Sequence, residues 1–139
     1  MGVQVNWLAV VLATASSMAV GAAWYARPVF GGVWARLVKL DDKKLQQGAG
    51  QAIGITILAS FLTAYVLAHV VYLSHAFFGN SFLQDALTTA FWLWLGLTAP
   101  RFITHDTFER RPFKLTFLNI SHELVTLLVM ALIIGLLRP

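Results

Sequence analysis

Four long apolar stretches dominate this chain of 139 residues and constrain what it can fold into. They run over residues 5–26, 51–73, 82–99 and 113–137, and none holds more than two charged side chains. A helix needs about 20 apolar residues to cross a hydrocarbon layer of about 30 Å. Backbone groups in lipid must pair within the protein, which an α-helix achieves within one segment. The sequence therefore predicts an all-α, polytopic membrane protein, a four-transmembrane-helix bundle that forms a single membrane domain over residues 1–139.

Composition excludes several classes of protein. Hydrophobic residues make up 58% of the chain and charged residues 12%, whereas charged residues make up about 25% of a soluble domain. A soluble chain this apolar would not cover its own surface with polar groups. The chain has no cysteine, which excludes disulfides, thiolate metal sites and cysteine nucleophiles. No other set of metal ligands is evident, so we expect neither a metal nor a cofactor.

The positive charge of the chain lies in two connecting segments. Nine of the ten Lys and Arg residues fall within 27–50 and 100–114, and none falls within 74–81. Positively charged loops stay on the cytoplasmic side of a membrane. The sequence thus predicts that these two segments face the cytoplasm and that both termini lie outside. This distribution explains the net charge of +4 without nucleic acid, and the expected partner is membrane lipid.

The fourth apolar stretch carries polar and ionisable side chains near its middle. Asn119, His122 and Glu123 share one helical face, and Glu123 lies about ten residues, or roughly 15 Å, from the start of the helix. Ionisable groups at that depth face a protein interior or water and mark a functional site by default. The alternative is a structural role in which Glu123 fixes the helix register. We predict a polar wall or ligand-binding surface formed by residues at similar depth: Asn119, His122, Glu123, Ser17, Ser60 and Trp94.

Small residues form a stripe along the first stretch. Ala9, Ala13, Ser17 and Gly21 recur at a spacing of four, which lets another helix backbone approach closely. The stripe therefore predicts a helix-packing surface. Its partner is either another helix of the same chain or a second copy of the chain.

Aromatic and charged residues in the two basic segments are predicted to anchor those segments. Trp24, Tyr25 and Trp34 fall where amphipathic rings settle at the headgroup level. Glu109 lies beside Arg111, and an ion pair from Glu109 to that residue or to a basic residue of the first segment would fix the loop geometry. An exposed pair of this kind contributes only about 0–1 kcal/mol.

The start of the third stretch carries a capping signal. Ser81 is followed by Gln84 three residues later, which is typical of a capping box at a helix N-terminus. Asp85 follows in the first turn, where the positive end of the helix dipole favours a carboxylate. The sequence therefore predicts that this helix begins immediately after Ser81.

Three signatures in the chain are found together in one known family. With them the chain resembles the bacterial membrane protein family catalogued as domain of unknown function 1761, over essentially its whole length. The resemblance implies a four-helix protein of the bacterial cytoplasmic (inner) membrane and implies no activity, because the family has none assigned. The signatures are Asn6-Trp7 with Gly21-Ala22-Ala23-Trp24-Tyr25 and Phe30-Gly31-Gly32-Val33-Trp34; Phe91-Trp92-Leu93-Trp94-Leu95-Gly96; and Phe108-Glu109-Arg110-Arg111-Pro112-Phe113-Lys114-Leu115 with Asn119 and His122.

Three classes of function are consistent with these observations. The polar face of the fourth stretch favours a small oligomeric binding or transport module for an apolar or lipid-like molecule. The small-residue stripes favour an accessory or assembly subunit that joins a homo-oligomer or a larger membrane partner. A membrane-embedded enzyme would use His122 and Glu123 for proton transfer, although adjacent helical residues diverge by about 100°.

Overall fold

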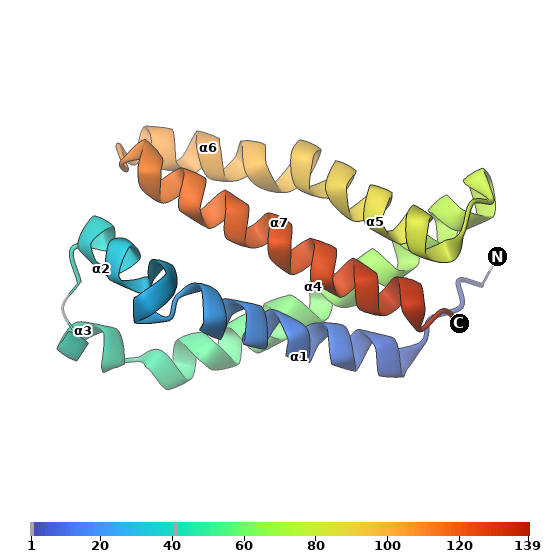
Figure 1. Cartoon of the computed structure of the whole chain (residues 1–139), viewed down its shortest axis with the longest axis horizontal. Coiled ribbons are helices and arrows are strands. Elements are labelled where there is room, and N and C mark those ends of the chain that lie inside the picture. Colours follow the sequence, from blue (N-terminus) through green and yellow to red (C-terminus); the bar gives the residue numbers. More distant parts are fainter. Residues whose placement is uncertain (1, 41) are drawn as a thin grey trace.

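The computed structural model describes residues 2–40 and 42–139, and within these residues all regular structure is helical (Figure 1). The chain contains seven α-helices and two π-helical turns among the described residues. In order they are α1 (Trp7–Trp24), η1 (Arg27–Gly31), α2 (Gly32–Val38), α3 (Asp42–Gln46), α4 (Ala49–Phe78), α5 (Phe82–Leu93), η2 (Trp94–Thr98), α6 (Ala99–Phe108) and α7 (Phe113–Leu136). The predicted all-α class is therefore confirmed.

Three helices in the described part of the chain are long and apolar enough to cross a membrane: α1, α4 and α7. They correspond to the stretches predicted over 5–26, 51–73 and 113–137. Helix α4 is longer than its prediction and continues to Phe78. Three helices of the described chain rather than the predicted four meet this criterion, because the segment predicted over 82–99 is not one α-helix.

The third stretch forms a continuous helical run that is interrupted by a π-turn. Helix α5 passes into η2, where the Ala99 N–H donates to the Trp94 carbonyl five residues earlier, and α6 then continues to Phe108. Pro100 lies in the first turn of α6. Proline lacks a backbone N–H and clashes with the carbonyl four residues before it, so it normally ends a helix. Here the wider π-turn before Pro100 lets the helix continue beyond the predicted end at residue 99.

Both chain termini lie at one end of the bundle, together with the turn between α4 and α5 (Figure 1). We call this the termini end and the opposite end, which holds α2 and α3, the basic end. Asn6 caps α1 by accepting a hydrogen bond from the Ala9 N–H, and its amide donates to the Leu137 carbonyl at 3.0 Å. One side chain thus joins the first turn of α1 to the end of α7.

The N-cap half of the predicted capping box is formed. The Ser81 hydroxyl accepts a hydrogen bond from the Gln84 N–H at 3.2 Å, and α5 begins at the next residue, Phe82. Gly79 closes α4 with a φ of +68°, a left-handed conformation that glycine adopts without a steric penalty. These two ends produce a tight α4–α5 turn.

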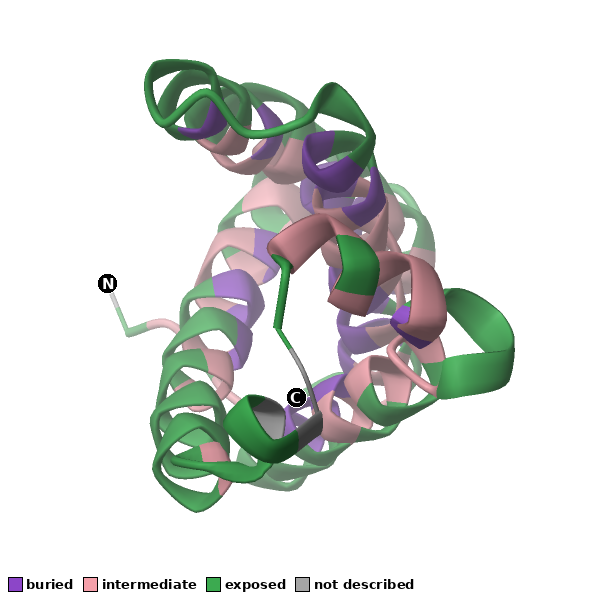
Figure 2. Ribbon diagram, turned by 90° about the vertical axis from the view of Figure 1, so that its left-hand side faces the viewer, coloured by how far each residue is buried: buried purple, intermediate pink, exposed green. Residues whose placement is uncertain are grey.

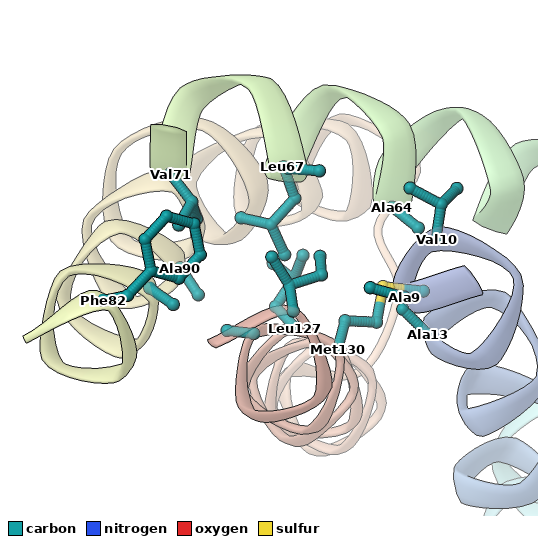
Figure 3. Close-up of a cluster of buried hydrophobic side chains, with 14 residues drawn as sticks. Ala9, Val10, Ala13, Ala64, Leu67, Val71, Phe82, Ala90, Leu127 and Met130 are labelled. Atoms are coloured by element: carbon teal, nitrogen blue, oxygen red, sulfur yellow. The ribbon is translucent and has the colours of Figure 1, made fainter. Parts of the chain in front are cut away.

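The core is built from side chains of α1, α4, α5 and α7, which Figure 3 shows converging between the helices. Ala9 and Ala13 of the small-residue stripe are almost completely buried, and Ser17 is 4% exposed. The stripe therefore packs within the chain, as predicted for a helix-packing surface. Figure 2 shows that the buried residues lie on the facing sides of the helices, whereas the outer faces are largely exposed.

Helices α5 and α7 approach closely at a glycine. A Cβ atom added to Gly135 would lie 2.9 Å from the Cα atom of Leu83 and 3.2 Å from the Cβ atom of Ala86. Real carbon atoms pack at about 3.5–4.0 Å. Gly135 therefore permits a backbone approach that any larger residue would prevent.

Candidate functional site

Side chains from α1 and α7 gather around His122. Its ring centroid lies 5.0 Å from that of Tyr25 and 6.0 Å from that of Trp24, both at the end of α1. On α7 itself, His122 Nδ1 lies 3.4 Å from Glu123 Oε1 and Nε2 lies 3.4 Å from Thr126 Oγ1. The two adjacent ionisable side chains thus converge, despite the angle between neighbouring positions on a helix.

Glycine makes room for this histidine. A Cβ atom at Gly21 would lie 3.7 Å from His122 Nε2, so the last residue of the small-residue stripe lies directly against the ring. The imidazole is only 14% exposed. A largely buried histidine needs polar neighbours for its ring nitrogens; Thr126 lies within hydrogen-bond distance of Nε2 and the Glu123 carboxylate within ion-pair distance of Nδ1.

Asn119 extends the same cluster towards the basic end. The Tyr25 hydroxyl donates to Asn119 Oδ1 at 3.1 Å, and the Tyr25 ring packs edge-on against Trp34 at 5.4 Å. Part of the predicted polar wall and part of the predicted loop anchors therefore form one assembly: Asn119 and His122 with Trp24, Tyr25 and Trp34. Trp34 belongs to α2, so the segment after α1 is fixed against this cluster.

One donor in the cluster is unsatisfied. The Trp24 Nε1 group is buried and has no hydrogen-bond partner among the described residues. A buried N–H without a partner costs about 1–3 kcal/mol. This donor is available to an acceptor that the described chain does not provide.

The other three residues of the predicted polar wall have separate environments. The Ser17 hydroxyl donates to the carbonyl of Thr14 in its own helix, and Ser60 is a partly exposed residue of α4. Trp94 donates from Nε1 to the Ile120 carbonyl at 2.8 Å and so ties η2 to α7. The structure thus brings together Asn119, His122 and Glu123. Among the described residues, no side-chain hydrogen bond or ring contact joins Ser17, Ser60 or Trp94 to this group.

Glu109 pairs within its own loop. Arg111 Nε donates to Glu109 Oε2 at 2.6 Å, and both side chains are about half exposed. This hydrogen bond and the carboxylate charge hold the pKa of Arg111 above its ordinary value. A feature that the sequence did not reveal lies beside it: buried Asp106 accepts a hydrogen bond from the Thr116 hydroxyl at 2.7 Å. Asp106 therefore links α6 to α7.

An apolar groove of about 330 Å³ lies between α4, the η2 region and α7. Seven of its eight lining residues come from α4 and from the run 93–98, and Leu127 of α7 completes the wall. Glu123 lies four residues before Leu127, one helical turn along the same side of α7. Its side chain is 34% exposed. The lining residues are Leu62, Thr63, Val66, Leu67, Leu93, Leu97, Thr98 and Leu127.

A second polar cluster, at the termini end, was missed by the sequence analysis as a site. Asp85 is 1% exposed. His75 Nδ1 lies 2.9 Å from Asp85 Oδ2, and the Asn80 amide donates to Asp85 Oδ1 at 2.9 Å. The available signal was the spacing: Asp85 in the first turn of one helix, preceded within ten residues by a histidine and an asparagine.

The fold and these sites define a small, all-helical protein with three helices that could cross a membrane and with polar clusters between its helices. Residues 8–135 match the family described as a protein of unknown function (DUF1761). The chain therefore belongs to this family, as its sequence signatures indicated. No match was found among curated proteins or among solved structures.

Proposed function

We propose that the chain is a four-pass protein of a bacterial cytoplasmic membrane that binds a lipid-like molecule between its helices. The apolar groove between α4, η2 and α7 carries this proposal. Six of its eight lining residues are aliphatic, and it lies between α4 and α7, two helices that are long and apolar enough to cross a membrane. In a membrane, these parts of α4 and α7 would be surrounded by acyl chains. An acyl chain is therefore the occupant that the groove would meet.

The fourth crossing in this proposal is the run α5–η2–α6. These elements cover 27 consecutive helical residues, 82–108, and about 20 are needed to cross the hydrocarbon layer. The charged residues of the run after residue 99 would extend beyond the apolar layer on the basic side. Both termini and the α4–α5 turn would then lie outside, in agreement with the distribution of Lys and Arg.

The polar wall has a defined place in this proposal. Asn119, His122 and Glu123 lie on α7 one to two turns from Leu127, the residue that closes the groove. A carboxylate there would limit how far an apolar chain extends towards the basic end, because burying it against hydrocarbon is costly. The groove would thus hold the apolar part of a ligand, and the polar wall would define its inner limit.

Lipid retention tests the proposal. The chain is purified in a mild detergent, and native mass spectrometry is used to measure the lipid that stays bound. Val66→Trp places a large ring in the groove, and we expect it to reduce retained lipid several-fold. Val11→Trp is the matched control, because Val11 on α1 is exposed to the same extent, 55%, but does not line the groove. Equal retention by the two variants would refute the proposal.

An assembly role is the second candidate function. Gly50 and Gly54 lie on the nearly fully exposed first half of α4, and a Cβ atom at either would meet nothing within 4 Å. Small residues at this spacing permit close contact between helices in a membrane. A homo-oligomer or a larger partner would bury this surface. Crosslinking between cysteines placed at residue 54 in two copies would support this role, and its absence at all protein concentrations would argue against it.

A further inference from the structure

A second pocket, of about 420 Å³, lies between α4 and α5 at the termini end. Its lining combines the buried side chain of Asp85 with the exposed aromatic rings of Phe78 and Trp92. Leu93 lines both this pocket and the apolar groove. The two hollows therefore adjoin at this residue, along a seam between α4 and the run α5–η2. The lining residues are Val70, Ser74, Phe78, Asn80, Asp85, Thr88, Thr89, Trp92 and Leu93.

Asp85 is the single formally charged residue that lines this pocket. Its carboxylate accepts one hydrogen bond on each oxygen, from His75 and from Asn80. An ionised carboxylate has about four acceptor positions, so two remain after these bonds. The two partners fix the orientation of the carboxylate; its side chain is 2% exposed, and a further donor would reach it from the pocket that it lines.

The charge of the site favours a cationic ligand. Asp85 supplies the one carboxylate among the described pocket residues, and the side chain paired with it is a histidine, not a Lys or Arg. Two aromatic residues, Phe78 and Trp92, are exposed at the pocket, and aromatic faces attract ammonium groups. The described pocket residues include no Lys or Arg to neutralise Asp85.

We propose that Asp85 binds the primary ammonium headgroup of the lipid-like molecule whose chain occupies the apolar groove, an inference that rests on the function proposed above. The primary ammonium donates to the free acceptor positions of the carboxylate, and the apolar chain follows the seam past Leu93 to Leu97 and Thr98. Thirteen residues separate Asp85 from Thr98, which corresponds to roughly 20 Å along the helix. That length suits an extended acyl chain.

Headgroup preference tests this assignment. The purified chain is incubated with three lipids that share the same acyl chains, phosphatidylethanolamine, phosphatidylcholine and phosphatidylglycerol, and native mass spectrometry measures the bound fraction of each. We expect the ethanolamine lipid to be retained roughly tenfold more than the choline lipid, the order given by one charge-assisted hydrogen bond. The choline nitrogen carries the same charge but has no N–H donor.

Two variants and one control test whether the preference for the ethanolamine lipid depends on Asp85 and its pocket. Asp85→Asn removes the negative charge at constant size, and we expect it to abolish the preference for the ethanolamine lipid. Thr88→Phe fills the pocket and leaves the carboxylate in place, and we expect the same loss; it decides the question if Asp85→Asn fails to fold. Asp106→Asn is the matched control, because Asp106 is also a buried carboxylate but lies outside the pocket. This control should keep the preference.

The outcomes separate this inference from the proposed function. If lipid is retained with no headgroup preference, the Asp85 assignment is wrong and the acyl-chain groove stands. If no lipid is retained, both are wrong. Dodecylammonium distinguishes the source of the headgroup: displacement of the ethanolamine lipid by dodecylammonium, but not by dodecanol, shows that the ammonium alone is recognised. Equal displacement by both compounds would contradict the assignment.

Discussion

The close contact between α5 and α7 at Gly135 predicts a large effect from a single methyl group. In Gly135→Ala, the new Cβ atom would lie 2.9 Å from the Leu83 Cα atom, which is backbone and cannot rotate away. Because carbon atoms pack at about 3.5–4.0 Å, the two helices would have to separate locally by about 0.6–1.1 Å. A gap of 0.5–1 Å already removes a quarter to a half of the dispersion energy of the contacts that it separates.

Two effects oppose each other in this variant. Alanine in place of glycine stabilises a helix interior by about 0.5–1 kcal/mol. Overpacking of a close contact costs about 1–3 kcal/mol. We expect a net loss of about 1 kcal/mol in the free energy of unfolding. The control is Gly54→Ala, where a Cβ atom meets nothing within 4 Å, so that only the favourable helical effect remains.

The measurement is the free energy of unfolding in mixed micelles, obtained by titrating the purified chain with sodium dodecyl sulfate and following helix content by circular dichroism. Since the helix preference is common to both variants, the difference between Gly135→Ala and Gly54→Ala isolates the packing cost, about 1–3 kcal/mol. If the two variants have equal stability to within about 0.5 kcal/mol, α5 and α7 do not pack closely at this position and the reasoning is refuted.

Three other outcomes are expected. Asn80→Cys should react with a membrane-impermeant maleimide added outside intact cells; reaction only from the cytoplasmic side would reverse the proposed topology. Ala13→Leu, at a fully buried position, should destabilise the chain by about 1–3 kcal/mol, whereas Leu at exposed Ala19 should not. Glu123→Gln should retain the fold because Gln keeps the size of the side chain and a polar group beside His122, and Glu123→Leu should lower stability; equal melting of the two would show that the His122–Glu123 contact contributes nothing.

The helices with the strongest local sequence signals were predicted most accurately. Long apolar stretches located α1, α4 and α7 to within a few residues, and the Ser81 capping box located the start of α5. The third stretch was predicted to end at residue 99, immediately before Pro100, and a proline inside a helical pattern usually does end the helix. Whether a π-turn will accommodate a proline depends on packing against α7, which the local sequence does not show.

The candidate site was predictable in part. Depth along a helix drew attention to Asn119, His122 and Glu123, and the structure brings these residues together on α7. Depth alone does not show which way a side chain on another helix points. The Ser17 hydroxyl, for example, donates to the Thr14 carbonyl of its own helix. The Asp85 cluster was missed because its partners come from the end of α4 and from the following turn, so its existence depends on how that turn folds.

The π-turn connects the fold to the proposed site. Buried or partly buried positions recur every four residues through Ala86, Ala90 and Trp94, and the next fully buried residue, Ala99, comes five residues later. The Ala99 N–H donates to the Trp94 carbonyl across this interval. Without the extra residue, everything after η2 would rotate by about 100° away from α7. The same insertion leaves Leu97 62% exposed as a wall of the apolar groove. One irregular turn thus maintains the contact of a 27-residue helical run with α7 and shapes the surface to which we assign lipid binding.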